Sequence, residues 1–319
     1  EVKVSGKKEL NVVLKEDTET LDEVVVVGFG TQKKVNLTGA VGLATAKELE
    51  SRPVTSATQA LQGLVPGLQI STSTGELDKT ADISIRGTGT IGEGSSGAPL
   101  ILIDGMEGDL NTVNPQDIEN ISVLKDAAAS SIYGSRAPFG VILVTTKSGK
   151  KGKTNVNYNN SFRISTPINM PEMMDSYQFA QYFNRAAENA GDSGPFSQEA
   201  LDRILAYQAG TLKETMTMNE QTRKWQAYGG ANANTDWFKE FYNDWVPSQE
   251  HSLSISGGTE KTQYTISGSF LDQNGLLRHG SDNFQRYTMN GKITSQIADW
   301  FTVTYSTKWT REDFDRPSY

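Results

Sequence analysis

The chain has 319 residues, enough for two domains or for one domain and part of a larger one. It contains no cysteine, which excludes disulfides, thiol catalysis and Cys–zinc sites. Its net charge of −8 disfavours a phosphate-binding surface, so nucleic acid is not an expected partner. Hydrophobic residues make up only 36% of the chain, which suits strands with one apolar and one polar face.

The first thirty residues combine a strand, a charged linker and a run of valines. Residues 10–14 predict a strand, and residues 1–20 are expected to be the end of a preceding β-domain and its linker. Residues 21–30, LDEVVVVGFG, favour extended structure because of their four consecutive valines. This segment is either an ordinary buried strand or an accessible strand that can add to the sheet of a partner.

Residues 31–150 predict a compact domain that contains both helix and strand. A helix is expected over residues 56–64, where Pro66 and Gly67 stop it. Asp126 is expected to cap a second, short helix on residues 127–129 that Gly134 ends. The predicted strands are residues 68–71, 83–86, 100–103, 121–124 and 141–144.

Residues 87–92 have the G-x-G-x-x-G spacing of a dinucleotide-binding loop, and Asp104 follows at a suitable distance. Such a loop must open a helix, yet residues 93–99 carry two more glycines and a proline. We therefore predict a flexible loop here. Five charges beside the predicted strands are expected to be structural pairs rather than ligands of a substrate: Arg86, Asp104, Lys125, Asp126 and Arg136.

From residue 151 onward, apolar and polar residues alternate in segments of about ten residues, as in the wall of an antiparallel barrel. The segment 154–164 is the first, and the pattern recurs around residues 253, 264, 287 and 301. A soluble β-sandwich would give the same alternation. Short turns at 257–260 and 298–299 contrast with an insertion at about 167–247, which predicts that the insertion is extracellular. It should hold helices over 176–189, capped by Asp175 and closed by Gly191, and over 198–208.

Catalytic chemistry finds little support in the sequence. The chain has only two histidines, His251 and His279, and neither lies near a serine in a nucleophile-elbow context. Nothing marks a carboxylate pair for glycoside hydrolysis. We therefore predict no enzyme activity, no catalytic residue, no cofactor and no metal site.

Residues 123–149, VLKDAAASSIYGSRAPFGVILVTTKSG, resemble the end of the plug domain in TonB-dependent outer-membrane transporters of the SusC/RagA family. That family typically has Ala-Ala-Asn-Gly where this chain has APFG at residues 137–140. The resemblance covers essentially the whole chain and includes residues 234–238. It implies an α+β plug domain at 31–150, followed at 151–319 by the first antiparallel strands of a transmembrane β-barrel of about 22 strands. Residues 1–20 would then end a carboxypeptidase-regulatory-like β-domain, and the location would be the outer membrane of a Gram-negative bacterium.

The same resemblance implies active import of a nutrient, an oligosaccharide or a peptide, with plug remodelling driven by TonB and its inner-membrane complex. The implied partners are TonB, a SusD-like surface lipoprotein and outer-membrane lipid. The TonB box at residues 21–30 would make its contact through Asp22, Glu23, Val24, Val25, Val26 and Val27. The plug loop near the substrate would contain Gly87, Thr88, Gly89, Thr90 and Glu93.

Two other functions stay open at this point. One is an outer-membrane signalling receptor of the same architecture, and the other is a soluble carbohydrate-binding or hydrolytic β-protein. The substrate is not expected to be readable from this sequence, because the loops that select it are expected mostly beyond Tyr319.

Overall fold

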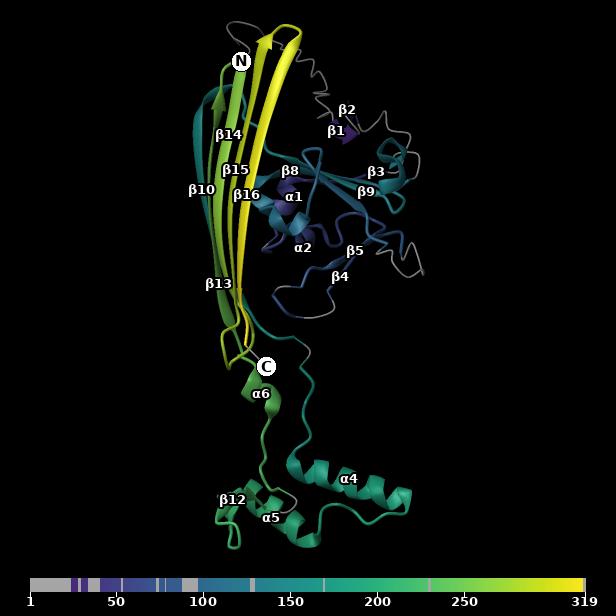
Figure 1. The fold of residues 1–319 in the computed structure, drawn as a ribbon, viewed down its shortest axis with the longest axis vertical. Coiled ribbons are helices and arrows are strands. Elements are labelled where there is room, and N and C mark those ends of the chain that lie inside the picture. Colours follow the sequence, from purple (N-terminus) through teal and green to yellow (C-terminus); the bar gives the residue numbers. More distant parts are fainter. Residues whose placement is uncertain are drawn as a thin grey trace, which may run out of the picture. The chain divides into compact units, whose positions relative to one another are not determined.

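The computed structural model describes residues 24–27, 30–33, 41–52, 54–72, 75–77, 79–87, 97–126, 130–168, 170–228 and 231–317. The chain consists of two compact units (Figure 1). The first comprises Glu1–Ser71 and Ala81–Lys147, and the second comprises Thr72–Thr80 and Ser148–Tyr319.

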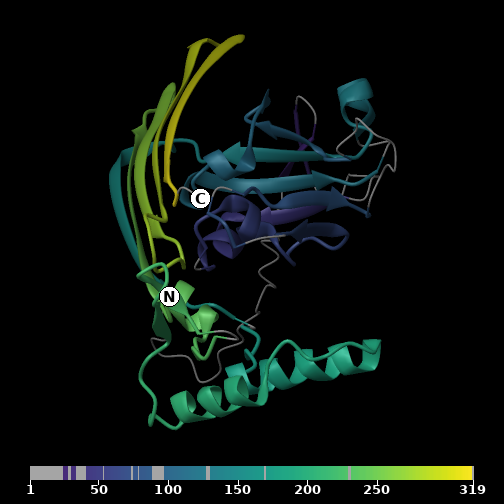
Figure 2. The same ribbon diagram turned by 60° about the horizontal axis from the view of Figure 1, so that its bottom comes forward.

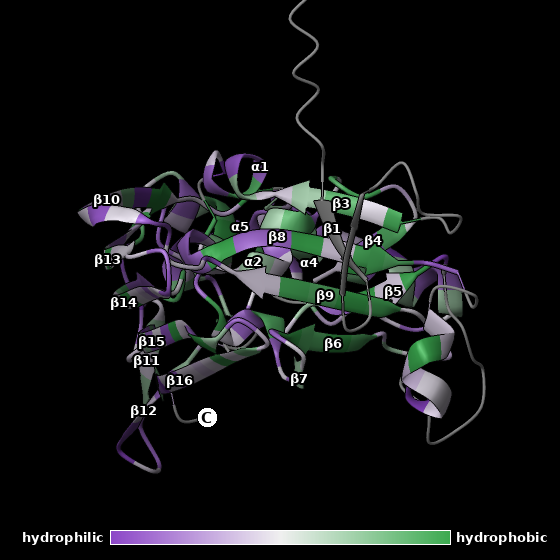
Figure 3. Cartoon of the chain, turned by 90° about the horizontal axis from the view of Figure 1, so that it is seen from above, coloured by the Kyte–Doolittle hydropathy of each residue, from purple (hydrophilic) through white to green (hydrophobic). Residues whose placement is uncertain are grey.

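The first unit is built on a five-stranded mixed sheet in the order β3–β8–β9–β6–β7. These strands are β3 (Val41–Thr45), β6 (Leu100–Ile103), β7 (Met106–Glu107), β8 (Ile118–Leu124) and β9 (Val141–Thr146). β6 and β9 are parallel, whereas the other neighbours are antiparallel. Figure 3 shows β6 and most of β9 as hydrophobic. A short, continuous apolar run of this kind is typical of a central strand that is buried on both faces.

Side chains of β8 and β9 alternate between two apolar layers, as strand geometry requires. Ile121 and Ile142 belong to the larger layer, together with residues of α1 (Ala46–Glu50) and α2 (Ala57–Leu61). Leu124 and Leu143 belong to the smaller layer on the opposite face, where Ala137 covers them. The unit also has two hairpins, β1 (Val24–Val27) with β2 (Gly30–Lys33) and β4 (Leu68–Ser71) with β5 (Asp82–Ile85), and 3₁₀ helices η2 (Leu110–Thr112) and η3 (Pro115–Asp117).

Of the two helices predicted in this unit, one differs from the structure. The helix expected over 56–64 is shorter, because Ser56 is its N-cap and accepts a hydrogen bond from the Thr58 backbone N–H, while Gly63 has φ +75°. The residues of the helix expected on 127–129 lie outside the described part. Gly134, with a non-helical φ of 64°, separates two short helical turns within the 3₁₀ segment η4 (Ser131–Arg136), so it interrupts the helix there as expected.

The second unit contains a wall of five antiparallel strands in the order β10–β13–β14–β15–β16 (Figure 1). They are β10 (Gly152–Ser165), β13 (Val246–Gly258), β14 (Thr262–Asn274), β15 (Asn283–Ala298) and β16 (Phe301–Asp315). Each has at least 13 residues, more than the roughly 9–11 that a tilted strand needs to cross a bilayer. The predicted alternating strands are therefore confirmed.

The segment between β10 and β13 contains two longer helices, which Figure 2 brings forward. α4 (Ser176–Ala190) begins with a capping box between Asp175 and Gln178 and ends at Gly191, whose φ is 84°. α5 (Gln198–Gln208), the hairpin β11 (Met216–Asn219) with β12 (Lys224–Ala227), and α6 (Trp237–Phe241) complete it. Among the described residues, the helices are all too short or too polar to span a membrane.

Candidate functional site

The valine run forms the first strand of a short hairpin. β1 is antiparallel to β2, with Val24 opposite Lys33 and Val27 opposite Gly30. β1 also lies close to β8 and β9 of the plug sheet. Within the described residues β1 pairs with β2 alone, so its other edge is not hydrogen-bonded to a named strand there. Asp22 and Glu23 lie outside the described part of the chain.

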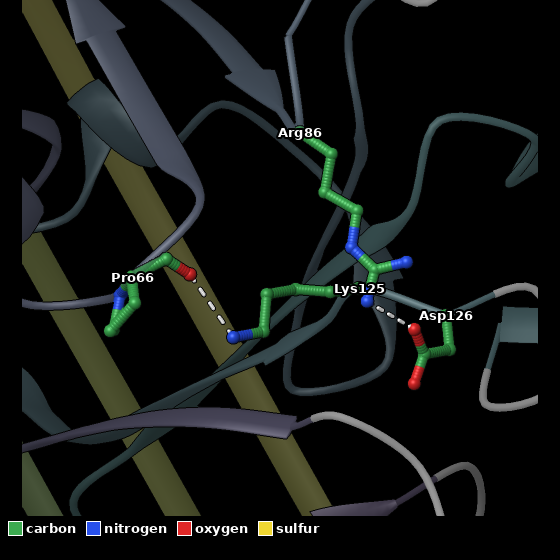
Figure 4. A network of polar contacts seen from close by, with 4 residues as sticks. All are labelled: Pro66, Arg86, Lys125 and Asp126. Carbon is green, nitrogen blue, oxygen red and sulfur yellow. Dashed lines mark hydrogen bonds and ion pairs between the residues drawn. The ribbon is translucent and has the colours of Figure 1, made fainter.

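A polar network joins three segments at the base of the predicted plug loop (Figure 4). The Arg86 guanidinium forms an ion pair with Asp126, which follows β8. The Lys125 ammonium donates a hydrogen bond of 3.0 Å to the Pro66 carbonyl oxygen. The Arg86 backbone N–H donates to the Gly67 carbonyl at 2.8 Å. The turn before β4, the end of β5 and the end of β8 are thereby tied together.

Arg86 adopts a left-handed backbone conformation with φ 59°, and Gly87 continues it with φ 92°. Two consecutive positive φ values turn the chain sharply as it enters the loop. The Arg86 side chain is 57% exposed, so solvent screens its ion pair and its contribution to stability is at most about 1 kcal/mol. The ion pair matters because it fixes the end of β5 beside the end of β8, at the base of the loop. The other loop residues, Thr88, Gly89, Thr90 and Glu93, lie outside the described residues.

Asp104 and Arg136 also contact groups of the first unit. The Asp104 carboxylate accepts hydrogen bonds from the Thr146 backbone N–H at 3.0 Å and from the Thr146 hydroxyl at 2.7 Å. Asp104 is therefore engaged at the end of β9. The Arg136 guanidinium lies 3.1 Å from the Glu107 carboxylate on β7.

The segment that leaves the first unit is attached at both of its ends. On the first unit, Lys147 forms an ion pair with Glu50, and its backbone N–H donates to the Asp117 carbonyl at 2.8 Å. On the second, a Cβ at Gly149 would lie 2.3 Å from the Tyr264 carbonyl oxygen, so the chain passes directly over the backbone of β14. Sequence reasoning missed these attachments. The sequence signals these contacts only by the run of small and basic residues at 147–153, and this run does not indicate which residues they contact.

The wall of the second unit has one apolar and one polar face. Val156, Tyr158, Phe162 and Ile164 of β10 are all at least 60% exposed on the apolar face. On the other face, Arg163 and Glu250 form an ion pair whose side chains are 14% and 6% exposed. This division, with polar residues sheltered and apolar residues exposed, is typical of a membrane barrel and opposite to a soluble sandwich.

The two histidines take part in local contacts. The His279 Nε2 atom lies 3.2 Å from the Glu240 carboxylate. His251 lies on the apolar face, where its Nδ1 atom is 2.7 Å from the Tyr158 hydroxyl.

Comparison with known proteins agrees with this geometry. The TonB-dependent Receptor Plug Domain family matches residues 33–141. The TonB-dependent receptor SusC of Bacteroides thetaiotaomicron is 35% identical over 291 residues, which are 88% of this chain and 25% of that protein. The TonB-dependent receptor P3 of Formosa agariphila is 33% identical over 303 residues, which are 95% of this chain and 26% of that protein.

A solved structure of the RagAB peptide importer in its open-open state matches with a TM-score of 0.73 and 31% identity, and covers 91% of this chain and 32% of that one. This is a SusC/RagA-like TonB-dependent receptor chain. Its first unit is the plug, and its second contains the first strands of the barrel with the insertion. The expected fold class and the outer-membrane location in a Gram-negative bacterium are confirmed. The chain spans about a quarter of the length of the curated relatives that it matches.

Proposed function

We propose that the complete SusC/RagA-like protein imports a nutrient, an oligosaccharide or a peptide, across the outer membrane with energy delivered by TonB. The observation that carries this proposal is the hairpin β1–β2, a valine strand placed immediately before the plug and close to β8 and β9. The similarity to SusC and to the RagAB peptide importer supports the same activity.

β1 suits recognition by strand addition because one of its edges pairs with β2, while its other edge has no strand partner among the described residues. Backbone hydrogen bonds at such an edge provide affinity for an incoming strand. The pairs of the hairpin run from Val24–Lys33 at its open end to Val27–Gly30 at its turn. Force on the chain before β1 therefore breaks these pairs one at a time, which requires less force than breaking all of them together.

The plug supplies the other half of the proposed mechanism. Substrate binds between the loop at 87–93 and the extracellular loops, and the network around Arg86 and Lys125 holds the base of that loop. When TonB pulls, the plug is remodelled and a path opens. No bond of the substrate is made or broken in this cycle.

A SusD-like surface lipoprotein is the proposed partner on the extracellular side. The insertion carries large side chains that are exposed in this chain, among them Tyr182 at 60% and Trp225 at 65%. Surfaces of this kind commonly mark protein–protein contacts. An obligatory partner would cover them.

Deletion of residues 22–27 from the complete protein tests the proposal. Uptake of the nutrient should fall to the level of a strain that lacks TonB, while binding of the nutrient to cells should stay unchanged. A matched control is deletion of residues 15–20, six residues of the preceding charged linker, which should leave uptake largely intact. Undiminished uptake after deletion of residues 22–27 would contradict the proposal.

A further inference from the structure

A groove interrupts the apolar face of the barrel wall. In register across β13, β14, β15 and β16, Leu253 is followed by Gly268, Met289 and Trp309. Large side chains thus surround Gly268, which has no side chain. The resulting groove has a volume of about 520 Å³, and Phe270 of β14 also lines it. This volume falls within the roughly 300–1,000 Å³ of ligand pockets.

The backbone does not require glycine at position 268. Gly268 is not among the residues with positive φ. A Cβ added there would meet only the Thr288 carbonyl oxygen, at an ordinary contact distance of 3.6 Å. Glycine inside a strand weakens it, and it often marks a place where another group approaches closely. Neither the backbone conformation nor the packing of the fold therefore explains the missing side chain.

One end of the groove carries a hydrogen-bonding group. The His251 Nδ1 atom lies 2.7 Å from the Tyr158 hydroxyl and 2.7 Å from the Asn160 amide nitrogen. The same Asn160 nitrogen lies 3.4 Å from the His251 Nε2 atom, and the tautomer of the ring decides which nitrogen donates. His251 therefore brings a polar ring to the end of an otherwise largely apolar groove.

Polar side chains enter the apolar face just beyond His251. The next residue of β13 on the same face is Gln249, which is in register with Asp272 of β14. Phe162 of β10 begins that row, which continues through Gln285 and Asp313, and Ile164 lies beyond it on the same face. The long insertion emerges at this end of the strands, so by the rule for outer-membrane barrels it faces the cell exterior. His251 therefore lies toward the extracellular end of the wall, at a level where aromatic and polar side chains meet on the outer face.

The rest of the barrel cannot cover this groove. β13, β14 and β15 each have both hydrogen-bonded neighbours within the wall, so further strands add beside β10 and β16 and not over the face. The solvent of that face is lipid. We propose that the groove binds one acyl chain of an outer-leaflet lipid, whose polar end lies beside the His251 ring. This inference depends on the membrane location and not on transport.

Native mass spectrometry of the complete receptor tests the inference, with a lipid extract of the outer membrane of the same bacterium as the probe. The unaltered receptor should retain one lipid under collision energies that strip the detergent. Gly268→Leu fills the groove, and it should lower the retained fraction at least tenfold. His251→Phe removes the polar ring nitrogens but keeps a ring, and it should lower retention severalfold.

Val303→Leu is the matched control, because it enlarges an exposed side chain elsewhere on the apolar face. It should retain lipid as the unaltered receptor does. Heat-modifiable gel mobility checks that each variant forms a folded barrel. Should Gly268→Leu fail to fold, Met289→Trp provides a second way to fill the groove.

Equal retention by the unaltered receptor and a folded groove-filling variant would overturn the inference, as would the absence of retained lipid. The same spectra report the number of receptor copies. A lipid-free dimer that Gly268→Leu converts to a monomer would show that a second copy occupies the groove, and would equally overturn the inference.

Discussion

Gly42 and Gly149 occupy positions where even one methyl group has no space. A Cβ at Gly42 would lie 2.2 Å from Cγ1 of Val65, a side chain that is 2% exposed. A Cβ at Gly149 would collide with the backbone of Tyr264 instead. Neither constraint can be inferred from the sequence, because in both cases the opposing residue is distant along the chain and only folding brings it close.

Gly42→Ala should destabilise the plug by about 1–3 kcal/mol, since the methyl group overpacks a close-packed layer. Native-state hydrogen exchange of the β3 and β8 amides in the intact protein measures this loss. Gly75→Ala is the matched control, because no atom lies within 4 Å of its Cβ position. The variant Gly42→Ala/Val65→Ala should recover part of the lost protection. Unchanged exchange in Gly42→Ala would contradict the packing described.

The charges of the plug show how far single residues could be predicted. Their positions beside buried strands suggested structural pairs, and the contacts of Arg86, Asp104 and Arg136 agree with that idea without testing it in solution. Their partners could not be predicted, because Asp126 is 40 residues from Arg86 and Thr146 is 42 residues from Asp104. The role of the five charges therefore stays a prediction.

Elements with strong local signals were predicted well. The alternation over 154–164 identified β10, and the residues around Asp175 and Gly191 identified both ends of α4. The short helices of the plug were predicted less well, because tertiary contacts decide their lengths. The helix expected over 56–64 is an example, since it is observed only over Ala57–Leu61.

The start of α4 should depend on pH through Asp175. The Gln178 backbone N–H donates to its carboxylate at 2.8 Å, and this bond holds the pKa of Asp175 below its ordinary value of 3.8. The folded state binds this proton less readily than the unfolded state. The stabilisation is therefore complete above about pH 4 and is lost as the pH falls through the lowered pKa.

Hydrogen exchange at the first turn of α4, corrected for the intrinsic rate, measures this effect and should show a loss of protection below about pH 4. Asp175→Asn removes the titration but keeps a capping oxygen, so its protection should be independent of pH in this range. Equal pH dependence in both proteins would show that the cap is not the cause.

The whole molecule combines a plug with the beginning of a membrane wall whose apolar face is turned to lipid. Tyr305 is at the centre of the apolar residues of β16, between Phe301 and Trp309, and is 64% exposed. The adjacent Thr304 is on the opposite face, where its hydroxyl lies 3.1 Å from that of Thr294. Tyr305 and Thr304 thus lie at the same depth in the wall, Tyr305 on the apolar face and Thr304 on the polar face.

Tyr305→Arg should cost about 2–4 kcal/mol, the cost of an arginine on the lipid face at the bilayer midplane, whereas Thr304→Arg should cost much less. The fraction of the complete protein that folds into lipid vesicles, measured by gel mobility without heating, compares the two. Similar yields from both variants would contradict the assignment of the faces.

The central claim is that TonB engages the valine strand ahead of the plug. Cysteine placed at Val25, with crosslinking to cysteines in TonB in living cells, tests it most directly. The account predicts a crosslinked product that increases when the nutrient is added and that is absent when the cysteine is placed at Thr18 in the linker. Equal crosslinking at both positions, or none at Val25 while uptake continues, would contradict it.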